Sequence, residues 1–161
     1  MLFRSDAGAI DGIIAPRAPL GFDRGDKRIG WLFDDPIAAA SEYYARTKIF
    51  PIMHVVGLRR TLADAHAWLP AALLKAFTKS KDIALDLLTD ESAPKASLPF
   101  VDVTIRKTRD MMSRDYWSYG LAANRHVLDT FLALHHAEGL SQRRLRPEEL
   151  FHPATLETHT I

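Results

Sequence analysis

The chain has 161 residues, of which 47% are hydrophobic and 25% are charged. This length corresponds to about one domain, and the composition excludes collagen-like, low-complexity and wholly disordered proteins. A net charge of +1 gives no general attraction to nucleic acid or anionic membranes, and the absence of cysteine excludes disulfides and thiolate chemistry. No apolar run reaches the roughly 18–20 residues of a membrane span, and no signal-peptide pattern is visible. We therefore expect a cytoplasmic protein that binds neither nucleic acid nor membrane.

The first third of the chain predicts a helix between two strands. Ile10 to Ala15 is typical of a strand, and residues 15–26 form a loop rich in proline, glycine and aspartate. Asp35 is a suitable N-cap for a helix that continues to Arg46. The run IFPIMHVVGL, residues 49–58, is apolar on both faces and therefore predicts a buried strand.

A long helical region follows. Thr61 and Asp64 resemble a capping box, and the helix is expected to reach about Thr89 with a kink or restart at Pro70. Its apolar stripe consists of Leu73, Leu74, Phe77, Ala84, Leu87 and Leu88.

The last third predicts further helices. Residues 102–113 are ambiguous between helix and strand, and we expect a helix; residues 114–120 form an aromatic loop. A helix from about residue 122 to 138 is ended by Gly139, and a short helix begins at Pro147. In the helix expected at about residues 122–138, the residues expected to face inward are Val127, Leu128, Phe131, Leu132 and Leu134.

The predicted sheet is too small for a complete α/β layer. Two strands and about five helices cannot form a parallel sheet that is covered on both faces. Either the chain is mostly helical, or its sheet is completed by residues that it does not contain.

Two residues stand out for their chemistry. His54 lies inside an apolar strand, where a buried imidazole costs free energy unless it has a partner. Such a histidine is more often a structural group, but it is also the best general acid or base candidate in this chain. Arg17 follows the first predicted strand, where an anion could be gripped by its planar guanidinium, although a solvated loop arginine has the same pattern.

Tyrosines form the second group of candidates. Tyr43 and Tyr44 end a helix, and one of them is expected to pack inward. An aromatic pocket could be lined by Tyr116, Trp117 and Tyr119, or these side chains could only fill space between packed elements. The sequence holds none of the HExxH, GxSxG, Walker or GxGxxG motifs, and a metal site built on His54 and carboxylates is only weakly indicated.

Four strings carry a family resemblance: GAIDGIIAPRAP, SEYYARTKIFPIMHVVGLRR, DYWSYGLAANRHVLDTFLALHHAEGL and RPEELFHPATLE. Together they resemble 4,5-dihydroxyphthalate decarboxylases, which are similar to solute-binding proteins of the type II periplasmic fold. Members are about twice as long, so the chain resembles a C-terminal half. Residues 8–48 would return from the second lobe through the hinge, and residues 49–157 would belong to the first lobe. One departure is Lys48, where the family pattern has glycine.

The resemblance implies an α/β fold, the helix-rich C-terminal portion of a two-lobed protein with few strands. It implies decarboxylation of an aromatic ortho-dicarboxylate to protocatechuate and carbon dioxide. His54 or Tyr44 would protonate the ring carbon. The residues expected to bind the substrate are Arg17, Arg46, Thr47 and Tyr116.

The resemblance demands no organic cofactor, and a divalent metal could assist. The expected partners are a small aromatic carboxylate, the missing N-terminal half and a second copy in a homo-oligomer. Two alternatives stay open. The chain could belong to a non-catalytic solute-binding protein for a small organic anion, in which His54 is a core residue, or it could be an inactive fragment.

Overall fold

The computed structural model describes residues 10–90, 92 and 97–156. The chain divides into two compact units, Met1–Tyr43 and Tyr44–Ile161. The boundary between the two units falls within one helix, α3.

The first unit contains α2 (Leu20–Asp23) and most of α3 (Pro36–Thr47). The predicted N-cap of α3 is confirmed, because Asp35 Oδ1 accepts hydrogen bonds from the backbone N–H groups of Ile37 (3.0 Å) and Ala38 (2.9 Å). The helix α2 interrupts residues 15–26, which the sequence predicted to be loop throughout.

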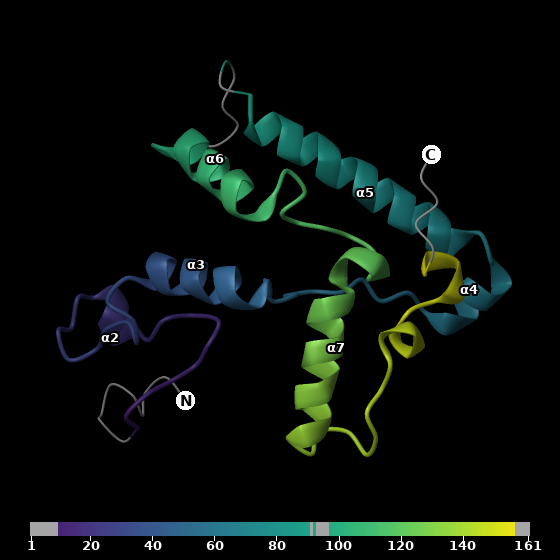
Figure 1. Ribbon diagram of the computed structural model, residues 1–161, viewed down its shortest axis with the longest axis horizontal. Helices are drawn as coiled ribbons and strands as arrows, with labels where there is room; N and C mark the ends of the chain where they lie inside the picture. Colours follow the sequence, from purple (N-terminus) through teal and green to yellow (C-terminus); the bar gives the residue numbers. More distant parts are fainter. Residues whose placement is uncertain (1–9, 91, 93–96, 157–161) are drawn as a thin grey trace. The chain divides into compact units, whose positions relative to one another are not determined.

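The second unit is helical (Figure 1). Its α-helices are α4 (Arg60–Ala65), α5 (Leu69–Leu88), α6 (Val101–Met112) and α7 (Leu121–Ala137). Two short 3₁₀ helices follow, η1 (Pro147–Leu150) and η2 (Pro153–Thr155).

Most of the helix predictions are confirmed. The long helical region restarts as α5 at Pro70, which occupies its first turn, where a missing N–H costs nothing. The ambiguous residues 102–113 form α6. Helix α7 stops where expected, because Gly139 adopts the left-handed region (φ +73°) and donates its N–H to the carbonyl of His136.

The capping box was predicted wrongly. Helix α4 begins at Arg60, one residue before Thr61, and its N-cap, Arg59, makes no side-chain capping bond. Thr61 therefore lies inside the helix, where its hydroxyl cannot act as the cap.

Both strand predictions are also wrong for the described part of the chain, in which every regular element is a helix. Residues 10–15 and 49–58 run as irregular chain, and Ile14 is fully exposed. A strand needs the N–H and C=O groups of a neighbouring strand, and the described residues offer none. The helix-rich part of the expected fold class is confirmed.

The apolar core of the described residues lies in the second unit and consists of Ala63, Ile105, Leu121, Leu128 and Leu132. Two residues of α7 that were expected to face inward do not, because Phe131 is 56% and Leu134 58% exposed. The same holds for Phe77 and Leu87 on α5, which are 45% and 41% exposed. The buried face of each of these helices is therefore narrower than the apolar sequence pattern predicted.

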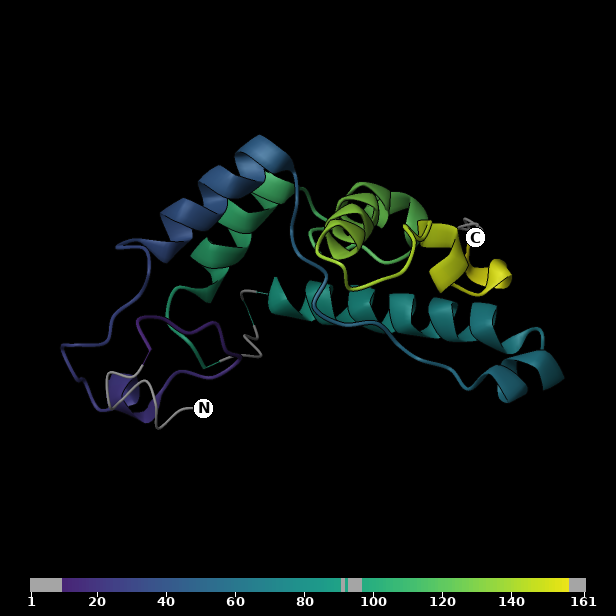
Figure 2. The ribbon, with the colours of Figure 1, turned by 90° about the horizontal axis from the view of Figure 1, so that it is seen from below.

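The C-terminal 3₁₀ helices connect the two long helices of the second unit (Figures 1 and 2). Helix η1 packs against α7 and η2 packs against α5. Arg125 of α7 forms an ion pair with Glu148 of η1. The hydrogen bond from Arg143 and the backbone hydrogen bond from Arg146 lower the pKa of Glu149 to about 2. Among the helices described, none combines the length and the apolar composition needed to cross a bilayer.

Candidate functional site

The end of α3 carries three of the predicted site residues, Tyr44, Arg46 and Thr47. The helix closes with a hydrogen bond from the N–H of Lys48 to the carbonyl of Tyr44 (2.8 Å). Lys48 adopts a left-handed backbone (φ +56°), and its Nζ lies 5.3 Å from the centroid of the Tyr44 ring. Tyr44 is half-buried, so this tyrosine is the more inward of the pair, because Tyr43 is 41% exposed.

Thr47 holds the chain as it leaves the helix. Its Oγ1 accepts a hydrogen bond from the N–H of Ile49 (3.1 Å). Its carbonyl lies 2.9 Å from Nε2 of His126 on α7, a distance at which a protonated ring nitrogen donates. The exit from α3 is therefore fixed to α7, and the hydroxyl predicted to bind substrate already accepts a backbone hydrogen bond.

The aromatic loop, residues 114–120, lies beside the same segment. The ring of Trp117 meets that of Phe50 edge to face, with 5.5 Å between centroids. Asn124 donates from Nδ2 to the carbonyls of Ser118 and Gly120, which fixes the end of the loop on α7. Tyr116, a predicted substrate-binding residue, is half-buried in this loop.

His54 is exposed, which contradicts its predicted burial in an apolar strand. Its neighbours Met53, Val55 and Val56 are 61%, 71% and 70% exposed. The burial was expected because the run is apolar on both faces, but no neighbouring strand covers it in the described chain. Arg17 is exposed too, and it belongs to the first unit, whereas the other predicted site residues belong to the second.

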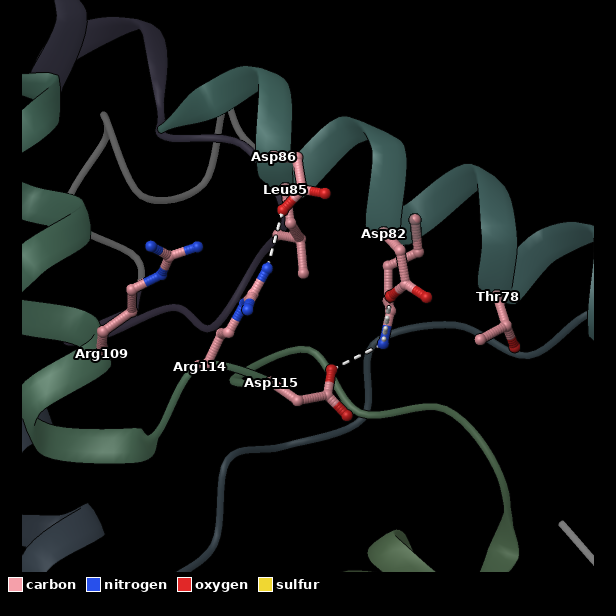
Figure 3. A pocket seen from close by; sticks show the side chains of 8 residues that line it. Thr78, Asp82, Leu85, Asp86, Arg109, Arg114 and Asp115 are labelled. Carbon is pink, nitrogen blue, oxygen red and sulfur yellow. Dashed lines mark hydrogen bonds and ion pairs between the residues drawn. The ribbon is translucent and has the colours of Figure 1, made fainter. Parts of the chain in front are cut away.

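A cleft of about 460 Å³ opens among α5, α6 and the start of the aromatic loop (Figure 3). Arg114 reaches Asp86 at 3.1 Å, and Lys81 donates to Asp115 at 2.6 Å. The cleft is lined by Thr78, Lys81, Asp82, Leu85, Asp86, Arg109, Arg114 and Asp115.

The charges of this cleft oppose the binding of a carboxylate. Three aspartates balance the three basic residues, and two of those basic groups are already paired with aspartate. Nε of Arg109 is buried and has no hydrogen-bond partner among the described residues, yet an incoming anion would meet the aspartates as well. The pairs therefore serve to fix the loop to α5 rather than to bind an acidic substrate.

Lys81 joins the cleft to the aromatic loop, and it was not among the site residues predicted from the sequence. Its side chain is 8% exposed, and its Nζ lies 5.3 Å from the centroid of the Tyr119 ring. Burial lowers the pKa of Lys81, but Asp115 and Asp82 outweigh it, and the net effect raises the pKa. The available signal was a lysine inside the predicted apolar stripe of α5, one turn after Phe77.

The described residues bring no three histidine or carboxylate side chains together as a metal site.

One relative is similar to this chain over nearly the whole of the chain. The chain is 58% identical over 154 residues to a 4,5-dihydroxyphthalate decarboxylase of Comamonas testosteroni. The match covers 96% of this chain and 47% of the relative. The resemblance to 4,5-dihydroxyphthalate decarboxylases is thereby confirmed. The chain spans about half the length of the curated relative it matches, and no protein-family model matches it.

Lys48 differs from the residue that the resemblance to decarboxylases predicts at this position. The resemblance led us to expect glycine at this position, and the backbone there has the positive φ that glycine adopts without cost. Lys48→Gly is therefore expected to raise the free energy of unfolding by about 0.5–1 kcal/mol. This is the gain from relieving the left-handed strain, reduced by the loss of the contact between Lys48 and the Tyr44 ring. Urea unfolding measures the change. Lys48→Ala is the control and should give no gain, since alanine keeps the strain.

Lys81→Met tests how the aromatic loop is held. The methionine keeps the buried stem but removes the ammonium between Asp115 and Tyr119, and we expect a loss of about 1–2 kcal/mol of unfolding free energy. The emission of Trp117, read in a background with Trp31 and Trp68 changed to phenylalanine, should shift to the red as the loop loosens.

The matched control is Lys79→Met, which removes an exposed lysine from the same helix. It should change neither stability nor emission. An unchanged Trp117 emission in Lys81→Met would show that the loop is held by other contacts.

Proposed function

We propose that this chain forms part of a decarboxylase that converts 4,5-dihydroxyphthalate to protocatechuate and carbon dioxide. The observation that carries the proposal is the 58% identity over 96% of the chain to a protein of that name. We further propose that the chain supplies the C-terminal portion of a two-lobed fold of the type II periplasmic binding kind. Its few strands would form only in the presence of the remaining part.

The reaction sets three chemical requirements. The bond between the ring and the leaving carboxylate breaks, and its electron pair stays on the ring carbon. A proton must then reach that carbon, while the second carboxylate is held in place. Water must be kept from the leaving carboxylate, because desolvation of its charge favours departure as neutral carbon dioxide.

The residues of this chain fit those requirements in part. Arg17 would hold the carboxylate that remains, with a guanidinium that matches it in two hydrogen bonds. His54 would donate the proton, and Tyr44 is the other candidate donor. Arg46, Thr47 and Tyr116 would contact the substrate, and the support for these three is their place at the end of α3 and in the aromatic loop.

The test uses two proteins. One is this chain alone, and the other is a chimera, the Comamonas testosteroni decarboxylase with its 154 matched residues replaced by those of this chain. Loss of 4,5-dihydroxyphthalate and release of carbon dioxide are followed with and without added divalent metal. We expect turnover by the chimera. Tight binding of the acid by the chimera without turnover would favour a solute-binding function, and neither binding nor turnover would overturn the proposal.

A further inference from the structure

Residues 52–58, here called the docking segment, have the composition of a strand but lie in no sheet. We propose that this segment is an interaction surface that pairs, as a β-strand, with strands of the polypeptide corresponding to the part of the decarboxylase that this chain does not match. The inference rests on the proposed function for the identity of that partner and goes beyond it in naming the surface.

The backbone supplies the first argument. Within the described chain, no backbone hydrogen bond joins residues 52–58 to another segment. Each of these residues carries an N–H and a C=O, and because successive residues direct these groups to opposite edges, strands on both sides of the segment could pair with all of them. Pro51 has no N–H, and its place just before the segment is one that a strand tolerates.

The side chains supply the second argument. Alternate residues of a strand point to opposite faces, so Ile52 and Val56 would lie on one face and Met53 and Val55 on the other. All four are exposed, by 39% to 71%, so both faces are apolar and uncovered. A strand that is apolar on both faces belongs inside a sheet with layers on either side. His54 would share the face of Ile52 and Val56.

The partner follows from what such a strand needs. Two copies of this chain could offer each other one strand, and a two-stranded ribbon would leave both apolar faces in water. Covering both faces takes further strands and at least one more layer. The match covers 47% of the relative, so more than half of the relative lies outside the match. That remainder is therefore the occupant to which the structure points.

The experiment compares hydrogen exchange of the segment in two proteins, this chain alone and the chimera defined above. In the chain alone the amides of residues 52–58 should exchange rapidly, and in the chimera they should slow by at least about tenfold. The measurement needs no substrate. Protection without turnover would therefore sustain this inference while the proposed function failed, and turnover with unprotected amides would do the reverse.

Substitution at Val55 supplies the second readout. Val55→Pro removes one N–H from the segment and should leave the melting temperature of the chain alone unchanged, because no hydrogen bond is lost there. The same change should lower the melting temperature of the chimera by several degrees. Val55→Thr keeps the N–H and the branched shape, and should leave the chimera close to the parent.

Besides unprotected amides in the chimera, two further results would overturn the inference. One is an equal effect of Val55→Pro in both proteins. The other is protection in the chain alone that grows with its concentration, which would assign the segment to a second copy of the chain.

Discussion

Replacing His54 by alanine in the chimera is expected to lower kcat by about 10²–10⁴, the usual contribution of a positioned general acid. KM should change little, because the proposed role of the imidazole is to protonate the ring carbon and not to hold the substrate. The assay is release of carbon dioxide under saturating 4,5-dihydroxyphthalate. The control is His66→Ala, an exposed histidine at the end of α4, which should leave kcat unchanged.

Tyr44→Phe separates the two proton donors that the residues allow. If His54 is the donor, loss of the Tyr44 hydroxyl should lower kcat by less than His54→Ala does. Near-normal turnover in His54→Ala with a collapse of kcat in Tyr44→Phe would transfer the role to the tyrosine. The half-buried position of Tyr44 at the end of α3 makes that outcome chemically reasonable.

The helices were predictable because their signals are local. Asp35 caps α3 through two hydrogen bonds to residues two and three positions away, and Gly139 ends α7 through its own backbone conformation. Pro70 lies in the first turn of α5, so the signal for the start of this helix is also local. The capping box was predicted wrongly because the pattern of Thr61 does not by itself determine the residue at which α4 begins.

The strands could not be predicted from the sequence because their formation depends on a partner. Residues 49–58 are apolar on both faces, as in a buried strand, but the described chain leaves them irregular and residues 50–57 exposed. The error in the predicted burial of His54 follows directly from that. Sequence composition reports which surface a segment is able to bury, whereas the neighbouring polypeptide decides whether it does so.

The candidate site shows the same division between local and distant information. Tyr44, Arg46 and Thr47 fall together at the end of α3 because they are adjacent in sequence. The contacts that fix this segment come from far along the chain, namely His126 on Thr47 and Trp117 on Phe50. No spacing rule links residues 79 positions apart, and these long-range contacts were therefore missed.

The second large effect is expected from Leu132→Ala in this chain, which should lower the free energy of unfolding by about 2–4 kcal/mol. Leu132 is 4% exposed on α7 and belongs to the small group of buried apolar residues of the second unit. Its truncation removes buried methyl groups and leaves a cavity. Because a typical domain is stable by only about 5–15 kcal/mol, a core of this size cannot absorb the loss easily. Urea unfolding followed by circular dichroism at 222 nm gives the change.

Leu134→Ala provides the control within the same helix. Leu134 is 58% exposed, and the intrinsic helix preference changes by the same amount in both variants, so only burial differs. The exposed site should cost less than about 0.5 kcal/mol in this chain. Equal losses at the two positions would mean that α7 packs differently from the arrangement described. In the chimera Leu134→Ala becomes informative in another way. A loss there that is absent from the chain alone would show that the remaining polypeptide also covers this face of α7, beyond the docking segment.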